Sequence, residues 1–213
     1  MPKCGYSDVG EAWREELGME DVVATVLSLW SEVKPLYREL HAYTRHKLLK
    51  LYGDAEVGPY IHAHLLVNLW AENWLALSDV LLPFPTSTPW TFRNHSHLLQ
   101  TAEHFYTTMG FDAMRPTFWS HSMFVKPKDR LVDCHAMAYD FGLNQDYRVR
   151  MCVGEGPSFA EAVHELGHVH YSASYRRLPA RLRRPPNSAF HEAVGETLAM
   201  AAHSPRCAHK TGT

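Results

Sequence analysis

The chain has 213 residues, of which 46% are hydrophobic and 12% aromatic, a composition typical of a globular protein whose core needs no metal or disulfide to form. Because 21 basic and 23 acidic residues leave a net charge of −2 without any block of like charge, nucleic acid and anionic membranes are not expected as partners. The N-terminus lacks the features of a signal peptide and no apolar run approaches the roughly 20 residues of a membrane span, so neither is expected in this sequence.

Apolar residues at helical spacing dominate the first half of the sequence. Between Asp21 and Tyr52 they recur every three or four positions, and Pro35 should break or kink the pattern, so two consecutive amphipathic helices are predicted. Further helices are predicted for about 62–80, before a Pro-Phe-Pro stop, and for 96–109. The core of this half is therefore expected to be helical.

The only convincing strand pair lies between two cysteines. Residues 135–139 and 147–151 alternate in character around a turn, which predicts a small antiparallel hairpin. Cys134 and Cys152 flank the hairpin and could be bridged across its base. Elsewhere, Asn94-His95-Ser96 matches a glycosylation acceptor pattern, which is short enough to arise by chance.

Two helices are predicted near the end of the chain. The capping box at 158–161 should start a helix at about Phe159, which runs until Leu178-Pro179. After an Arg-Arg-Pro-Pro linker and two candidate N-caps, a last helix is predicted for Ala189–Ala202.

The first of these helices carries the run His164-Glu165-Leu166-Gly167-His168. Histidines four residues apart leave the same helix face one turn apart, so both imidazoles can meet a single ion. Glu165 projects at a different angle, so it cannot easily share the ion but can reach a water beside it, as a general base must. We interpret the run as two ligands and the general base of a zinc-dependent peptidase.

Two carboxylates on the last helix are candidates to complete the site. Tight zinc binding needs more than two protein ligands, and Glu192 is the best candidate for the third, because two such helices can pack side by side. Glu196 lies four residues further on the same face and could accept a hydrogen bond from the other ring nitrogen of a ligating histidine. One Zn²⁺ is the predicted metal.

An alternative interpretation needs no metal. His164 and His168 would then be helix-surface residues paired with Glu161 or Glu165, which a chain with 15 histidines makes less improbable than usual. Most other histidines are interpreted as satisfied polar or partly buried residues, and none is proposed as a ligand: His62, His64, His95, His97, His104, His121, His191 and His203.

These motifs resemble those of the angiotensin-converting enzyme family, zinc peptidases that release C-terminal dipeptides from oligopeptides. The family pattern His-Glu-Met-Gly-His corresponds to His164-Glu165-Leu166-Gly167-His168, and His-Glu-Ala-Ile-Gly-Asp corresponds to His191-Glu192-Ala193-Val194-Gly195-Glu196. Shorter matches such as Gly5-Tyr6-Ser7-Asp8 and Leu40-His41-Ala42-Tyr43 extend the likeness over nearly the whole chain, to about Pro205.

The resemblance implies a role for several positions. It implies zinc ligands at His164, His168 and Glu192, and a base and proton shuttle at Glu165. It also implies a substrate-facing edge at His135, Ala136 and Ala138, and a disulfide between Cys134 and Cys152. Chloride is implied as an activator, with Arg14 and Tyr52 near the anions.

The resemblance further implies a fold and a setting. The expected architecture is a mainly α, zincin-type metallopeptidase core with one small antiparallel hairpin, forming a single partial domain over 1–213 whose zinc-site segment is 158–203. The family domain continues past Thr213 with the histidine and tyrosine that stabilise the transition state and with the residues that hold the substrate carboxylate. This chain alone is therefore expected to be weakly active or inactive. The family itself is extracellular, either secreted or membrane-anchored.

The sequence departs from the family pattern at a few positions. His62 stands where the family has Pro, Val67 where it has Gly, and Pro185-Pro186 where it has Gly-Ala. Glu196 replaces Asp, so its longer side chain must fold back to keep the hydrogen bond expected of it.

Two other functions compete with a dipeptide-releasing peptidase. A non-catalytic binding or decoy protein would keep the fold without needing zinc, so its folding and partner binding should survive a His164→Ala, His168→Ala double substitution. A different zinc hydrolase could use the same three ligands with another exopeptidase specificity, which product analysis on a peptide ladder would reveal.

Overall fold

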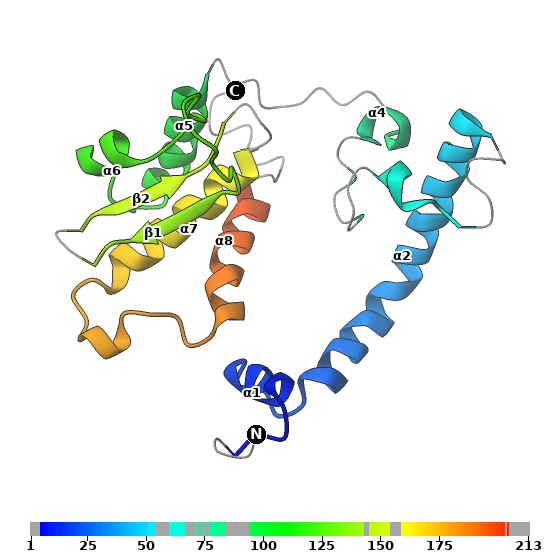
Figure 1. The fold of residues 1–213 in the computed structure, drawn as a ribbon, viewed down its shortest axis with the longest axis horizontal. Coiled ribbons are helices and arrows are strands. Elements are labelled where there is room, and N and C mark those ends of the chain that lie inside the picture. The colour runs from blue at the N-terminus through cyan, green and yellow to red at the C-terminus, as the bar shows by residue number, and fades with distance from the viewer. Residues whose placement is uncertain are drawn as a thin grey trace. The chain divides into compact units, whose positions relative to one another are not determined.

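The computed structural model is mainly helical with one small antiparallel sheet, which confirms the expected fold class (Figure 1). The chain divides into two compact units, unit 1 with Met1–Gly18 and Pro89–Thr213 and unit 2 with Met19–Thr88. No described helix combines the length and the apolar character that crossing a membrane requires. The structure describes residues 5–53, 60–66, 71, 74, 77–83, 94–142, 145–153, 159–202 and 204.

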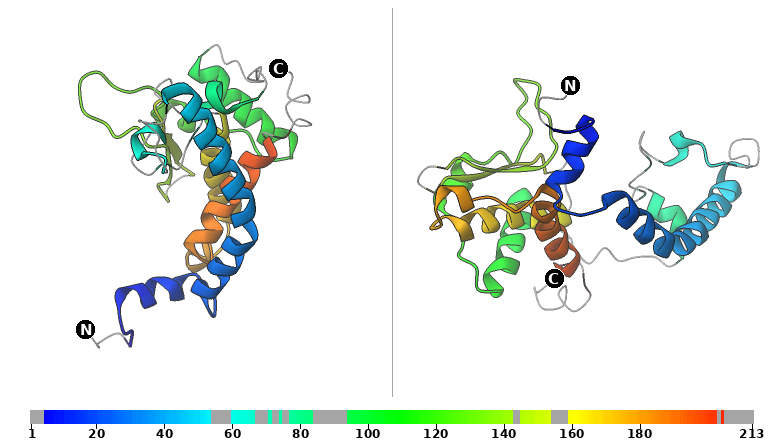
Figure 2. Two further views of the ribbon diagram at one scale, coloured as in Figure 1. Left: turned by 90° about the vertical axis from the view of Figure 1, so that its right-hand side faces the viewer. Right: turned by 90° about the horizontal axis from the view of Figure 1, so that it is seen from below.

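Unit 2 is built on one long helix, α2 (Val22–Tyr52). It begins after Asp21, whose side chain accepts a hydrogen bond from the Ala24 backbone N–H at 2.9 Å. The helix continues through Pro35 without interruption (Figure 2), so the prediction of two helices was wrong. Proline removes only one backbone donor, and the strong helix former that follows it, Leu36, continues the helix.

The single helix predicted for 62–80 is also wrong. The structure has a short 3₁₀-helix, η1 (Ala63–Leu66), and a single helical turn, α4 (Ser78–Leu81). Ala71, between them, has a φ of 53°, which lies outside the right-handed helical region. Ala71 therefore interrupts the predicted helix, and residues 67–70, 72–73 and 75–76 of that prediction lie outside the described residues.

The core of unit 2 is small. Among the described residues, Leu48 of α2 and Leu66 of η1 are its buried apolar residues, and Trp74 packs against them. The Tyr43 hydroxyl donates a hydrogen bond to the Leu81 carbonyl at 2.6 Å, which ties α2 to α4.

Unit 1 begins with α1 (Val9–Glu16) and continues with α5 (His95–Thr108) and α6 (Pro116–His121). The helix predicted for 96–109 is confirmed to within one residue at each end. Asn94, the first residue of the glycosylation pattern, is the N-cap of α5, and its side chain accepts a hydrogen bond from the His97 backbone N–H at 2.9 Å.

The predicted hairpin is present as β1 (Met137–Asp140) paired with β2 (Tyr147–Arg150) in antiparallel register. Residues 122–124 pair with the other edge of β2: the Met123 backbone accepts from Met151 N–H at 2.8 Å and donates to the Val149 carbonyl at 2.9 Å. β2 is therefore paired on both edges. The edge of β1 on the side away from β2 remains available to contact the rest of unit 1.

The last two helices are α7 (Phe159–Tyr175) and α8 (Ser188–Ala202), separated by the 3₁₀-helix η3 (Ala180–Leu182). α7 starts where predicted, and Ser158 of the capping box lies outside the described residues. α7 and α8 pack against each other, with β1 and α5 also against α7 (Figure 1). The buried core of unit 1 comprises Leu98, Leu99, Ala102, Phe105, Tyr106, Phe118, Tyr147, Val149, Met151, Phe159, Ala162, Val163, Leu166, Val169 and Ala202.

Candidate metal centre

Two glycines let α7 and α8 approach closely. A Cβ atom at Gly167 would lie 2.9 Å from the Tyr106 hydroxyl and 3.1 Å from the Gly195 Cα, and one at Gly195 would lie 2.9 Å from the His164 ring. A side chain at either position would therefore collide with a neighbour. The close approach is what brings residues of α8 beside the histidines of α7.

Three donor atoms converge at this crossing. The Nε2 atoms of His164 and His168 are 2.9 Å apart, and Glu192 Oε2 lies 3.1 Å from the first and 3.6 Å from the second. Among the residues that the structure describes, these three side chains form a group able to hold one metal ion.

The donor set fits zinc. With zinc–ligand bonds of about 2.0–2.1 Å in tetrahedral geometry, donor atoms lie roughly 3.3 Å from one another. The distances of 2.9, 3.1 and 3.6 Å bracket that value. Two imidazole nitrogens and one carboxylate oxygen also leave a fourth position for water or substrate, which is the arrangement of catalytic zinc sites.

The protonation state of His168 suits a metal ligand. Burial is the main cause that lowers the pKa of His168 to about 4, with the charges of His191 and His164 acting in the same direction and Glu192 opposing the shift. A neutral imidazole at pH 7 keeps a lone pair available for a metal ion.

Glu196 lies beside the imidazole ring of His164. Its Oε1 lies 3.4 Å from His164 Nδ1, on the side of the ring away from Glu192. At this distance the carboxylate can orient the imidazole, and the longer glutamate side chain does reach the ring.

Glu165 is buried beside the three donors and takes no part in their convergence. Burial is the main cause that raises its pKa to about 7, with the charges of Glu192 and Glu161 acting in the same direction and a hydrogen bond from the Ala138 backbone N–H opposing the shift. Its Oε2 has no hydrogen-bond partner among the described residues. A carboxylate with a pKa near neutrality and a free oxygen can accept or give a proton at physiological pH.

A cleft of about 410 Å³ opens in front of this group. One wall of the cleft is formed by the first two residues of β1 and the two residues before them, His135, Ala136, Met137 and Ala138. Residues of α7 and α8 form the other wall. The Ala138 N–H is directed to Glu165 rather than to β2, so this part of β1 turns its backbone toward the cleft.

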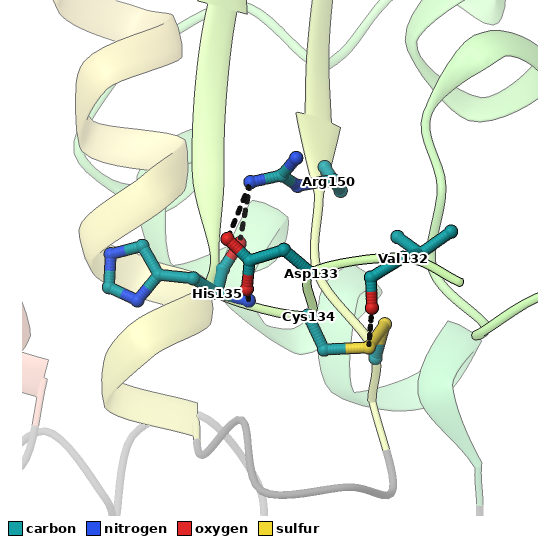
Figure 3. The surroundings of a disulfide bond; sticks show 6 residues. Val132, Asp133, Cys134, His135 and Arg150 are labelled. Atoms are coloured by element: carbon teal, nitrogen blue, oxygen red, sulfur yellow. Dashed lines mark hydrogen bonds and ion pairs between the residues drawn. A yellow bond between two sulfur atoms is a disulfide. The ribbon is translucent and has the colours of Figure 1, made fainter.

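A disulfide and an arginine hold the wall in place (Figure 3). Cys134 is bonded to Cys152, with Cα atoms 5.2 Å apart. Arg150 of β2 donates to the His135 carbonyl at 3.4 Å and lies 3.7 Å from the Asp133 carboxylate. Figure 3 shows the His135 ring on the side of the chain away from the disulfide. The possible bridge across the base of the hairpin is therefore formed.

Two positions expected near chloride lie in different units. Arg14 is on α1 of unit 1, and Tyr52 is the last residue of α2 in unit 2. The structure describes each of these two residues within its own unit. That they lie near chloride stays a prediction.

Sequence reasoning missed three residues of the cleft, Met137, Glu161 and His191. The His191 ring stacks on His168, with centroids 4.1 Å apart, although His191 was interpreted as an ordinary polar residue. Its position immediately before Glu192 was the only signal that could have indicated this. Met137 lines the cleft between two expected positions, and no pattern in the sequence marked it.

Residues 2–213 match the family model described as angiotensin-converting enzyme. The chain is 39% identical to the angiotensin-converting enzymes of Mesocricetus auratus and Rattus norvegicus, over 98% of its own length and 17% of theirs. It is 32% identical to the angiotensin-converting enzyme of Haematobia irritans exigua, over 97% of its own length and 36% of that protein.

The chain thus spans well under half of the relatives it matches, although the match covers almost all of its own residues. On this match, the chain belongs to the angiotensin-converting enzyme family of peptidases.

Proposed function

We propose that this chain carries the zinc site of a peptidase that releases dipeptides from the C-terminus of oligopeptides. The observation that supports the proposal is the convergence of three donor atoms, from His164, His168 and Glu192, at distances that suit one zinc ion. The family implies the same metal and the same class of substrate.

His164, His168 and Glu192 would hold the zinc ion, which would supply the Lewis acidity that activates a water molecule and a peptide carbonyl. Glu165 takes a proton from the attacking water and passes it to the leaving amine. Its burial and its unpartnered Oε2 support this role. A nearby dication also favours the ionised carboxylate, which is the form that accepts the proton.

The other residues orient the participants. Glu196 lies beside the ring of His164, and the wall at His135, Ala136 and Ala138 faces an extended peptide bound in the cleft. Chloride activation involving Arg14 and Tyr52 remains part of the proposal, on the family resemblance alone. We also keep the proposal that residues 1–213 are part of one larger peptidase domain.

Zinc stoichiometry by elemental analysis tests the site. We expect one zinc per unsubstituted chain, a collapse of that value in Glu192→Ala, and its retention in Glu165→Gln, because Glu165 does not ligate. Absence of zinc from the unsubstituted chain would refute the proposal and favour a non-catalytic binding protein.

Mass spectrometry of products from a peptide ladder tests the specificity. Dipeptides whose release is abolished by Glu165→Gln would support the proposed reaction. Release of single amino acids would instead indicate a zinc hydrolase with another exopeptidase specificity.

A further inference from the structure

The first turn of α8 is held by residues of α1 that are far away in sequence. The Glu16 carboxylate accepts hydrogen bonds from the Ser188 backbone N–H at 3.0 Å and from the Ser188 hydroxyl at 2.8 Å. Beside it, the Asn187 side-chain amide donates to the Leu17 carbonyl at 3.1 Å. We call Glu16 and Leu17 the α1 anchor.

The α1 anchor satisfies groups that a helix cannot satisfy by itself. The first backbone N–H groups of an α-helix have no partner within the helix. In α8, Asn187 Oδ1 accepts from the Phe190 N–H at 2.7 Å, whereas the Ser188 N–H is taken by Glu16. A carboxylate at this end also interacts favourably with the helix dipole.

Glu192 lies between this anchor and a second fixed point. It follows Ser188 by four residues, one turn along the helix, and precedes Gly195 by three, where α8 meets the His164 ring. Its side chain is 59% exposed, so few contacts of its own restrict it. The position of its carboxylate therefore depends on both ends of this stretch of backbone.

We propose that Glu16 is a positioning residue for the zinc site, which acts through the first turn of α8 to hold Glu192 in place as the third ligand. This inference rests on the zinc site proposed above. Helix ends fray when their orphan groups lose their partners, and a ligand held less firmly must be ordered when the metal binds. Glu16 itself belongs neither to the three donor residues nor to the residues that line the cleft.

The test measures metal binding rather than turnover. Zinc affinity of the 213-residue chain is determined by competition with a chromophoric chelator, and the absorption of the cobalt(II)-substituted chain reports ligand geometry. Glu16→Ala should weaken zinc binding roughly three- to tenfold, since a lost helix cap is worth about fivefold in an equilibrium constant. It should also reduce the intensity of the cobalt bands.

Two further variants separate positioning from a general loss of stability. Glu16→Gln keeps an acceptor for the Ser188 N–H and a donor for its hydroxyl, so its zinc affinity should stay within about twofold of the parent. Ser188→Ala removes one of the two hydrogen bonds to Glu16, so its zinc affinity should lie between those of the two Glu16 variants. This variant also provides the test if Glu16→Ala does not fold. Glu20→Ala, an exposed acidic residue outside the anchor, is the matched control and should bind zinc like the parent.

The outcomes are distinct. Zinc affinity and cobalt spectra that are unchanged in Glu16→Ala, even with lowered thermal stability, would overturn the positioning role. Equal losses in Glu16→Ala and Glu16→Gln would overturn it as well, because the hydrogen bonds would then not matter. A parent chain that binds no zinc would overturn the proposed function instead.

Discussion

α7 and α2 have similar apolar periodicity but very different surroundings. Ten of the 17 residues of α7 are buried, whereas only two of the 31 residues of α2 are. α7 packs against α8, α5 and the hairpin, while among the described elements of unit 2 the strongest packing partner of α2 is the short α4. Periodicity selects the face that a helix can bury, but neighbouring elements decide whether that face is buried.

The difference extends to chemistry. On α7, burial raises the pKa of Glu165 and lowers the pKa of His168 and of His170, whose ring packs against Tyr106 and Phe111. On α2 most of the large apolar side chains remain exposed, including Leu36 at 72%. The pKa shifts therefore occur where a titratable side chain is buried in a packed interface.

The largest expected effect is in the core of α7. Leu166 is fully buried, so Leu166→Ala removes packed apolar volume and should lower the free energy of unfolding by about 2–5 kcal/mol. Urea-induced unfolding measures this value. Leu182→Ala, at a position that is 52% exposed, is the control, and a loss below about 1 kcal/mol for Leu166→Ala would contradict the packing described here.

The second prediction concerns the pH dependence of the metal-free chain. The pKa of Glu165 is raised from 4.5 to about 7, so its stabilising contribution is complete below pH 4.5 and is lost as the pH rises through about 7. Glu165→Gln stays neutral, so above pH 7 its free energy of unfolding should exceed that of the parent by up to roughly 3 kcal/mol.

Urea unfolding in the presence of a chelator, at pH values from 4 to 8, tests this prediction. The gain should disappear below pH 4.5, and exposed Glu32→Gln on α2 should stay within about 0.5 kcal/mol of the parent throughout. A difference that does not vary with pH would show that Glu165 is not the titrating group.

The third prediction addresses the helix crossing. In Gly195→Ala the new methyl group would meet the His164 ring, so we expect a loss of about 1–3 kcal/mol in the free energy of unfolding. Zinc affinity should fall by about tenfold or more, because the ring must move. Thr197→Ala, at an exposed position of the same helix, is the control, and an unchanged zinc affinity in Gly195→Ala would argue against this crossing.

The smallest effect is expected on α2. Because Leu36 is 72% exposed, Leu36→Ala should change the free energy of unfolding by less than about 0.5 kcal/mol. Urea unfolding together with size-exclusion chromatography measures it. A loss above about 1.5 kcal/mol would mean that this face is buried in solution, and the contrast with α7 would then fail.

Local signals predicted much of unit 1. The helix candidate that ends before Gly110 predicted α5 to within a residue, and alternation between two cysteines predicted the hairpin, although β1 starts two residues later than expected. Strand pairing is shorter because the chain at His135 is held by the side chain of Arg150 and by the disulfide rather than by backbone pairing with β2. The same reasoning was wrong at Pro35 and at Ala71, where a continuous helix and a positive φ replaced the expected break and the expected helix.

By itself, the sequence determined the identity and order of the possible ligands. Four-residue spacing places His164 and His168 on one helix face in any structure where that helix forms, because the period of the helix is a property of the backbone. Only the tertiary structure decided how near Glu192 lies to them. That distance depends on two glycines that meet without Cβ atoms, on the stacking of His191 against His168, and on the contact of α1 with α8. These contacts join residues that are far apart in the sequence, and their separation along the chain does not tell how close they lie in space.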